Sequence, residues 1–194
     1  MVVSLRPTAL ALTSVLLAAL SPLPAIAGQT VNEPPIARFH RVDEHLFRGA
    51  QPTEAGLRHL RDLGVRTVIN LRAEGDAEVA NERRIAESLG MRFVHIAIRD
   101  GNCFTRFRRI PEDTVKQFFD VLDTTPGPLF IHCRRGTDRT GAIVAFYRIA
   151  RNGWNAERAL REANDRGMRL WYRGLRRQIK AFDSAVVQSA PPTR

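Results

Sequence analysis

Residues 129–141 read LFIHCRRGTDRTG, and this stretch decides the fold. Residues 129–132 predict a short buried strand, residues 133–139 a tight loop, and residues 140–150, TGAIVAFYRIA, an apolar helix. Backbone N–H groups of a tight loop that leads into a helix N-terminus converge on one point and favour an anion there. The stretch therefore predicts an anion site between a strand and a helix.

The side chains of this loop suit chemistry on a phosphate group. Cys133 stands at the mouth of the loop, where the field of the amides stabilises a thiolate and makes it nucleophilic at neutral pH. Arg139, on the first helical turn, can hold two phosphate oxygens in a fork. Gly136 supplies a backbone conformation closed to other residues. The Thr140 hydroxyl is placed to donate a hydrogen bond to the sulfur and ease its departure.

Predicted strands and helices alternate along the rest of the chain. Strands are expected at residues 36–42, 46–50, 65–71 and 91–98. Helices are expected after the N-cap Thr53, with Leu57, Leu60 and Leu63 on one side, and then from about Asp76, from Pro111, and over residues 156–166 and 170–187. This alternation predicts one α/β domain whose sheet is covered by helices on both faces.

At its centre the sequence resembles the protein tyrosine phosphatase superfamily. The signature of that superfamily is His-Cys, five residues, Arg, then Ser or Thr and Gly, which matches His132-Cys133 and Arg139-Thr140-Gly141. The resemblance is closest to the dual-specificity branch, and residues 46–74, LFRGAQPTEAGLRHLRDLGVRTVINLRAE, look like its atypical fungal, plant and bacterial members.

In all, the resemblance covers about Val42 to Ala181. It implies a mixed sheet of about five strands with helices on both sides. It also implies a two-step hydrolysis of phosphate monoesters through a cysteinyl-phosphate, without a metal or cofactor. For His132 we favour a buried, hydrogen-bonding brace over a general base.

Expulsion of an alkoxide needs a carboxylic acid that protonates the leaving oxygen and later deprotonates water. In the family this is an Asp on a loop roughly thirty residues before the Cys, and Asp100 precedes Cys133 by 33 positions. Its rivals are Asp113, read as a first-turn helix charge, and Asp76, read as an N-cap. The expected catalytic residues are Cys133, Arg139, Asp100 and Thr140. The expected phosphate-binding residues are Arg134, Arg135, Gly136, Thr137, Asp138 and Arg139, with no metal site.

The N-terminus has the layout of a signal peptide. Arg6 precedes an uncharged run at residues 9–20, and Ala25-Ile26-Ala27 offers small residues for cleavage. We therefore expect residues 1–27 to be removed, residues 28–187 to form the catalytic domain and residues 188–194 to be a disordered tail. The protein would be periplasmic or secreted, with a bacterial envelope favoured.

The formal charge of +10 favours anionic partners. Extra arginines crowd the loop and the segment around Asp100, which favours a small polyanion such as an inositol polyphosphate or phosphoinositide headgroup over a phosphorylated protein. These arginines are Arg134, Arg135, Arg99, Arg106, Arg108 and Arg109. Contact with an anionic membrane surface also fits, whereas the export signal and 7% aromatic content disfavour nucleic acid. The oligomeric state is not predicted.

Three other interpretations of the Cys133 loop are open. A non-catalytic polyanion binder would keep the loop but has little use for the thiol, and a rhodanese-like or arsenate-reductase-like enzyme also uses a Cys loop without requiring Asp100. Cys133 could also be a buried structural thiol. Cys103, three residues after Asp100, is either a small buried residue or a partner that traps Cys133 as a reversible disulfide.

Overall fold

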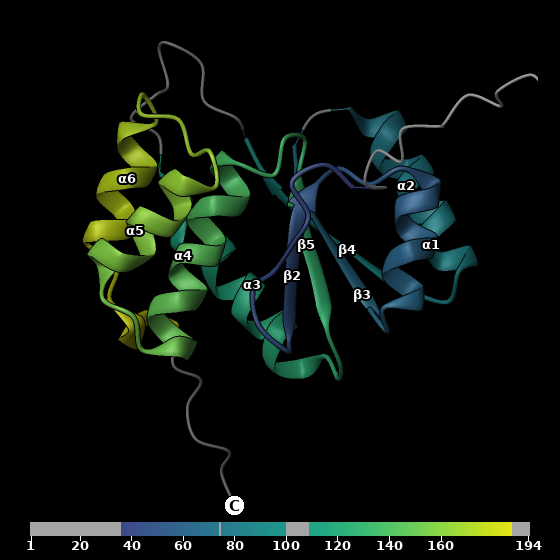
Figure 1. Cartoon of the computed structure of the whole chain (residues 1–194), viewed down its shortest axis with the longest axis horizontal. Helices are drawn as coiled ribbons and strands as arrows, with labels where there is room; N and C mark the ends of the chain where they lie inside the picture. Colours follow the sequence, from purple (N-terminus) through teal and green to yellow (C-terminus); the bar gives the residue numbers. More distant parts are fainter. Residues whose placement is uncertain (1–35, 74, 100–108, 188–194) are drawn as a thin grey trace, which may run out of the picture. The chain divides into compact units, whose positions relative to one another are not determined.

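The computed structural model describes residues 36–73, 75–99 and 109–187 (Figure 1). Its strands are β1 (His40–Arg41), β2 (Leu46–Ala50), β3 (Thr67–Arg72), β4 (Arg92–Ile98) and β5 (Leu129–Cys133). Its α-helices are α1 (Glu54–Asp62), α2 (Asp76–Ser88), α3 (Glu112–Thr124), α4 (Asp138–Asn152), α5 (Ala156–Asp165) and α6 (Arg173–Lys180), followed by a 3₁₀ turn, η1 (Ser184–Val187). The predicted signal peptide and tail lie outside the described residues. Within those residues, no helix has the length and apolar character needed to cross a membrane.

The five strands form one mixed sheet in the order β1-β2-β5-β3-β4, which confirms the sheet that the resemblance implied. β5 runs parallel to β2 and β3, and β3 runs parallel to β4. Parallel strands end at the same edge of a sheet, so the loops that follow these four strands meet there, where open α/β sheets bind ligands. The central strand of this edge is β5, which ends at Cys133.

Helices cover both faces of the sheet, as predicted. On one face Val68 and Phe130 pack in a core with α1 and α2. On the other face Ile69 and Ile131 pack with α3, α4, α5 and α6. Adjacent residues such as Val68 and Ile69 fall in different cores because successive side chains of a strand point to opposite faces of the sheet. Figure 1 shows α1 and α2 on one side of the sheet and α4, α5 and α6 on the other.

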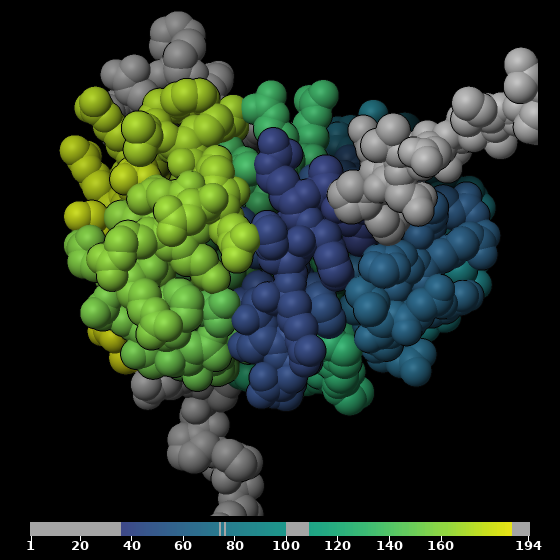
Figure 2. Space-filling model, in the orientation of Figure 1, coloured from purple at the N-terminus to yellow at the C-terminus, as the bar shows by residue number. Residues whose placement is uncertain are grey.

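The edge strand β1 is shorter than predicted. The strand itself is limited to His40–Arg41, which pair with β2 in antiparallel fashion, and on either side of it Ala37 O accepts from Ala50 N and Val42 N donates to Leu46 O. Arg38 has a positive φ of 54°, which takes the chain out of the extended conformation before β1. Figure 2 shows this early part of the described chain, in purple, at the surface between the C-terminal helices, in green to yellow, and α1 and α2, in blue. A two-residue edge offers little backbone for pairing with another chain.

Thr53 caps α1 as predicted, since its Oγ1 accepts a hydrogen bond from Gly56 N at 3.2 Å. The prediction that Leu63 shares the buried side of α1 is wrong. Its exposed fraction is 42%, whereas Leu57 and Leu60 are buried. Leu63 is the C-cap of α1 and therefore lies past the last helical residue, where the chain turns out of the helix.

The single helix predicted over residues 170–187 is also wrong, because α6 spans only Arg173–Lys180 and η1 follows it separately. Before α6, Asp138 Oδ1 accepts a hydrogen bond from Arg169 N at 2.9 Å and holds a turn. After α6, Asp183 Oδ1 accepts from Ala185 N at 2.9 Å. Side-chain oxygens thus satisfy backbone N–H groups that a continuous helix would have paired with its own carbonyls.

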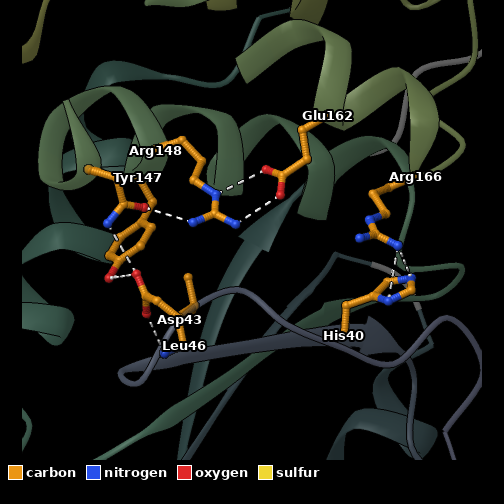
Figure 3. A network of polar contacts seen from close by, with 8 residues as sticks. His40, Asp43, Leu46, Tyr147, Arg148, Glu162 and Arg166 are labelled. Carbon is orange, nitrogen blue, oxygen red and sulfur yellow. Dashed lines mark hydrogen bonds and ion pairs between the residues drawn. The ribbon is translucent and has the colours of Figure 1, made fainter. Parts of the chain in front are cut away.

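A polar network ties the β1–β2 turn to helices α4 and α5 (Figure 3). Asp43, in the turn, accepts a hydrogen bond from the Tyr147 hydroxyl at 2.8 Å. Burial alone would raise the pKa of Asp43, but this bond, others from backbone N–H groups and one from Asn152 hold it below its ordinary value. Arg148 on α4 donates to both carboxylate oxygens of Glu162 on α5, at 3.1 and 2.9 Å. The network therefore anchors the C-terminal half of the helix whose first residues follow the Cys133 loop.

Candidate active site

Cys133 lies in the middle of the carboxyl edge of the sheet. It is the last residue of β5, pairs in register with Ala50 of β2, and is only 3% exposed. Residues 134–137 form the loop, and α4 begins at Asp138. The predicted order of strand, loop and helix is therefore confirmed.

Gly136 is the one loop residue with a positive φ, of 71°, as the sequence predicted. A Cβ at this position would lie 2.3 Å from the carbonyl oxygen of Gly49 and 2.6 Å from the backbone N of Ala50. The loop therefore packs directly on the backbone of β2. Glycine is required here both by the left-handed conformation and by this close approach.

The carbonyl oxygens of three successive loop residues are held from outside the loop. Arg134 O is 3.5 Å from Gln51 N, Arg135 O is 3.4 Å from Arg38 Nη1, and Gly136 O is 2.8 Å from Arg48 Nη2. In a planar trans peptide the N–H of the next residue points opposite to the carbonyl. The N–H groups of residues 135, 136 and 137 therefore point away from these donors and toward the inside of the loop. This is the arrangement that binds an anion.

Arg139 is fixed on the opposite side of the loop from these donors. Its side chain is 4% exposed, and Nη1 donates to the carbonyl oxygens of Ile98 at 3.0 Å and Leu71 at 3.4 Å. Ile98 is the last residue of β4 and Leu71 lies in β3, so two strands of the sheet fix the orientation of the guanidinium. A guanidinium carries five N–H donors in a rigid fork and is suited to phosphate.

Arg48 lies on the protein side of the loop and was missed by the sequence interpretation. It is 2% exposed, and its Nε and Nη1 have no hydrogen-bond partner among the described residues. Burial lowers its pKa to about 10, while the charge of Glu162 and that of Cys133 act in the opposite direction. A buried cation is thus held directly behind the loop. The segment LFRGA gave no signal beyond an arginine inside a predicted strand.

The site opens into a cavity of about 170 Å³. Its walls are Cys133, Arg134, Arg135, Asp138, Arg139, Arg169 and Tyr172. The sequence interpretation missed Arg169 and Tyr172, which come from the turn between α5 and α6. Arg169 Nη2 donates to the Tyr172 hydroxyl at 2.7 Å. The one signal that could have revealed Arg169 is the acidic Asp138 inside a basic loop, because a buried carboxylate needs a cationic partner.

Asp138 lines the cavity, but its carboxylate is engaged by other residues, so its role in phosphate binding stays a prediction for its backbone N–H. It is 4% exposed, and its Oδ2 accepts from Arg169 Nε at 2.9 Å and from the Thr137 hydroxyl at 3.0 Å. An unpaired carboxylate would repel a phosphate, but the guanidinium of Arg169 neutralises the charge of the Asp138 carboxylate. The side chains of Asp138 and Thr137 therefore stabilise the site. Their backbone N–H groups are the donors with which these two residues can bind an anion.

Thr140 is fully buried, and the hydrogen bond predicted from its hydroxyl to Cys133 is not made in this structure. Its Oγ1 has no hydrogen-bond partner within the described ranges. His132 is also fully buried, and Nε2 of its ring lies 2.7 Å from Oε1 of Glu82 on α2. The other oxygen of Glu82 accepts from Asn70 Nδ2 at 3.0 Å. This position agrees with a brace beneath the loop rather than a base in the cavity.

The other residues predicted for the site are only partly described by the structure, and only some of those described line the cavity. Asp100, Cys103, Arg106 and Arg108 lie outside the described residues. Arg99 and Arg109 are exposed but do not line the 170 Å³ cavity, whereas Arg134 and Arg135 are exposed and do line it.

The two rivals of Asp100 lie at the starts of helices. Asp113 lies in the first turn of α3, as its helix-charge interpretation required. Asp76 begins α2, but the N-cap is Gly75, so the N-cap interpretation of Asp76 is wrong.

The described residues offer no metal site, and a second, larger cavity among them does not suit an anion. No group of three or more His, Cys, Asp or Glu side chains placed to hold a metal ion occurs in the part of the chain that the structure describes. A larger cavity of about 570 Å³ lies at the far end of α4 and includes Asp43, Glu44 and Asp123 in its walls. Its carboxylates do not favour an anion, and Cys133 is not among its lining residues.

Comparisons with known proteins agree with this geometry. The family described as DSP-PTPase phosphatase fused to NAD+ kinase matches residues 30–173. Inositol diphosphatase DSP4 of Arabidopsis thaliana is 33% identical over 116 residues, which are 59% of this chain and 56% of that protein. Dual specificity protein phosphatase TpbA of Pseudomonas aeruginosa is 28% identical over 135 residues, which are 69% of this chain and 56% of that protein. The matches thus span about half the length of these curated relatives.

Solved structures show the same fold. The crystal structure of TpbA superposes with a TM-score of 0.64 at 24% identity, covering 80% of this chain and 90% of that one. The core catalytic domain of the PP-IP phosphatase SIW14 from S. cerevisiae has a TM-score of 0.62 at 21% identity, covering 77% and 87%. With its signature loop, its sheet and a family match over most of its length, this chain belongs to the atypical dual-specificity branch of the protein tyrosine phosphatase superfamily.

Proposed function

We propose that this chain hydrolyses phosphate monoesters through a cysteinyl-phosphate intermediate. The observation that carries the proposal is that Cys133 and Arg139 line one cavity of about 170 Å³ at the end of the central strand. The loop between them has its carbonyl oxygens held outward, which leaves backbone N–H groups for the phosphate. A nucleophile and fixed donors for the same group thus stand together.

In the first step the Cys133 thiolate attacks phosphorus. An S–P bond forms, and the P–O bond to the leaving group breaks. The loop N–H groups and Arg139 hold the non-bridging oxygens, and Asp100 gives its proton to the leaving oxygen. Support for Asp100 comes from its neighbour in sequence, Ile98, whose carbonyl oxygen is 3.0 Å from Arg139 Nη1. The chain therefore leaves β4 beside the guanidinium, two residues before Asp100.

In the second step a water molecule attacks the phosphorus of the cysteinyl-phosphate. The Asp100 carboxylate takes a proton from this water, the S–P bond breaks, and inorganic phosphate leaves. We assign to Thr140 the hydrogen bond that stabilises the departing sulfur. Its buried hydroxyl, without a partner among the described residues, is available for that bond.

Small polyanionic substrates, such as inositol phosphates or phosphoinositide headgroups, suit the mouth of this cavity best. One phosphate needs Arg139 and the loop N–H groups, but Arg134, Arg135 and Arg169 also line the cavity. Additional cations around one phosphate site favour additional phosphates on the substrate. The name of the DSP4 relative, an inositol diphosphatase, points in the same direction.

We also propose that residues 1–27 export the protein, on the strength of their signal-peptide composition. The catalytic domain would then act in the periplasm or outside the cell. Detection of a mature N-terminus at residue 28 in the periplasmic or secreted fraction tests this. An intact N-terminus on protein that stays in the cytoplasm would contradict it.

A phosphate-release comparison tests the substrate class. The value of kcat/KM should be higher for inositol polyphosphates than for phosphotyrosine peptides and should fall steeply with added salt. The Arg134→Ala, Arg135→Ala double variant should cost the polyanion about 1 to 3 kcal/mol more than p-nitrophenyl phosphate, in line with charged hydrogen bonds. Arg84→Ala, at an exposed position on α2, is a control for charge loss elsewhere. A double variant that treats both substrates alike would contradict this substrate class.

A further inference from the structure

Two large exposed apolar side chains lie between two residues that line the cavity. The exposed fractions are 72% for Leu170 and 56% for Trp171. They lie between Arg169 and Tyr172, which both line the cavity. Among the described residues, the one other large apolar side chain with comparable exposure is Leu63, at 42%, and it lies at the end of α1 on the opposite face of the sheet.

The turn that presents these side chains is held in place. The Asp138 carboxylate accepts hydrogen bonds from Arg169 N and from Arg169 Nε, both at 2.9 Å. Within the turn, Arg173 N donates to the carbonyl oxygen of Trp171 at 2.8 Å. The Tyr172 ring is buried beside them, at 5% exposure. Leu170 and Trp171 are therefore exposed on a fixed backbone, whereas the next residue, Tyr172, is buried.

The surface around this apolar pair is strongly basic. Residues 166–182 contain six basic residues and no acidic residue. Arg166 and Arg173 flank the turn and are exposed, as are Arg134 and Arg135 of the phosphate loop. The guanidinium of Arg169 lies over the ring of Trp171, 5.0 Å from its centroid. An exposed apolar pair on a basic segment, next to a phosphate site, is complementary to a surface that is anionic outside and apolar beneath.

We propose that Leu170 and Trp171 insert into an anionic lipid surface and so bring the mouth of the cavity to phosphorylated headgroups. Trp is enriched at membrane interfaces, and arginines near the surface are attracted to anionic lipids. Two protruding side chains are too small to form a protein interface, which buries about 800 Å² on each partner. They are sufficient to add apolar contact to an electrostatic attraction.

The emission of Trp171 tests this locally. The full chain is titrated with vesicles of phosphatidylcholine, alone or mixed with phosphatidylglycerol, and the signal of Trp171→Phe is subtracted because Trp154 also emits. Co-sedimentation alone would not suffice, since residues 9–20 are apolar and can bind vesicles themselves. On mixed vesicles the Trp171 emission should shift to shorter wavelengths and be quenched by lipids brominated in the acyl chain.

Leu170→Glu and Leu63→Glu form a matched pair, because each places the same charge on an exposed leucine. Leu170→Glu should weaken the Trp171 signal at least about tenfold in lipid concentration, and Leu63→Glu should leave it unchanged. Added salt should weaken it as well. The proposal is overturned if Trp171 does not respond to the mixed vesicles, if it responds equally to pure phosphatidylcholine, or if the two leucine variants behave alike.

Docking and catalysis can fail separately. Insertion requires no turnover, so Cys133→Ser should bind the mixed vesicles like the native chain. Hydrolysis of soluble p-nitrophenyl phosphate requires no lipid, so Leu170→Glu should retain it. Loss of the Trp171 response with normal hydrolysis would reject docking alone, and a normal response without hydrolysis would reject the proposed chemistry alone.

Discussion

The guanidinium of Arg48 donates a hydrogen bond from Nη2 to the carbonyl oxygen of Gly136 at 2.8 Å, although Arg48 is 2% exposed. A cation from the second strand therefore supports the phosphate loop from behind. Burial of this cation is costly, because its Nε and Nη1 have no hydrogen-bond partner among the described residues. We therefore expect Arg48 to contribute more to the geometry of the loop than to the stability of the fold.

Arg48→Met should separate these two contributions. We expect kcat/KM for p-nitrophenyl phosphate to fall about tenfold or more, since the loop loses its support. The free energy of unfolding should change by less than about 1 kcal/mol, because the lost hydrogen bond is offset by removal of a buried, partly unpartnered charge. Arg48→Lys should recover part of the activity. A fully active Arg48→Met would show that the contact does not position the loop.

Gly136→Ala and Gly64→Ala compare two glycines with similar positive φ, 71° and 83°. At Gly64 a Cβ would meet nothing within 4 Å, so Ala should cost only the strain of the left-handed backbone, about 1 to 2 kcal/mol. At Gly136 the Cβ would lie 2.3 Å from the Gly49 carbonyl oxygen. Chemical denaturation should show a clearly larger loss for Gly136→Ala, together with loss of activity. Equal losses would mean that the loop does not pack on β2 as described.

The bond between Asp43 and Tyr147 should make stability depend on pH. The pKa of folded Asp43 is lowered, so the ionised carboxylate stabilises the fold fully above the ordinary carboxyl range. This contribution to the free energy of unfolding is lost as the pH falls below about 4. Burial and Asp43 raise the pKa of Tyr147, so the neutral hydroxyl contributes fully to the free energy of unfolding below about pH 10, and its contribution declines above that pH.

Tyr147→Phe should therefore cost about 0.5 to 1.5 kcal/mol at pH 7 and less at pH 3, measured by denaturation at both values. In an Asp43→Asn background this dependence on pH should disappear, because the titrating partner is gone. A cost of Tyr147→Phe that is the same at pH 7 and pH 3 would contradict the assignment.

Asp100→Asn tests the general acid. The value of kcat on alkyl phosphates should fall by about 10²-fold to 10⁴-fold, the usual contribution of a general acid. The loss should be smaller on p-nitrophenyl phosphate, whose leaving group needs little protonation. Asp113→Asn is the matched control, since Asp113 is exposed in the first turn of α3 and should have little effect. Equal losses on both substrates would reject Asp100.

The sequence predicted those parts of the molecule that depend on local pattern. The strand, loop and helix around Cys133, the cap at Thr53 and the glycine conformation at Gly136 all follow from residues close together in the chain. The apolar character of residues 129–132 was enough to predict β5, because a buried parallel strand is apolar on both faces.

The parts that the sequence did not predict depend on contacts between distant segments. Arg48 precedes Gly136 by 88 positions, and Arg169 follows Asp138 by 31. No periodicity links such pairs. The same contacts explain why the helix predicted from residue 170 begins only at Arg173, since the carboxylate of Asp138 holds Arg169 in a turn before it.

The cysteinyl-phosphate mechanism is tested most directly by trapping the covalent intermediate. The chain is mixed with p-nitrophenyl phosphate, quenched rapidly in acid and digested, and the peptides are analysed by mass spectrometry. We predict a peptide that carries one phosphoryl group on Cys133, absent from Cys133→Ser, which should also lose turnover while still binding vanadate. Turnover by Cys133→Ser, or a turning-over native enzyme with no phosphoryl group on Cys133, would contradict the mechanism.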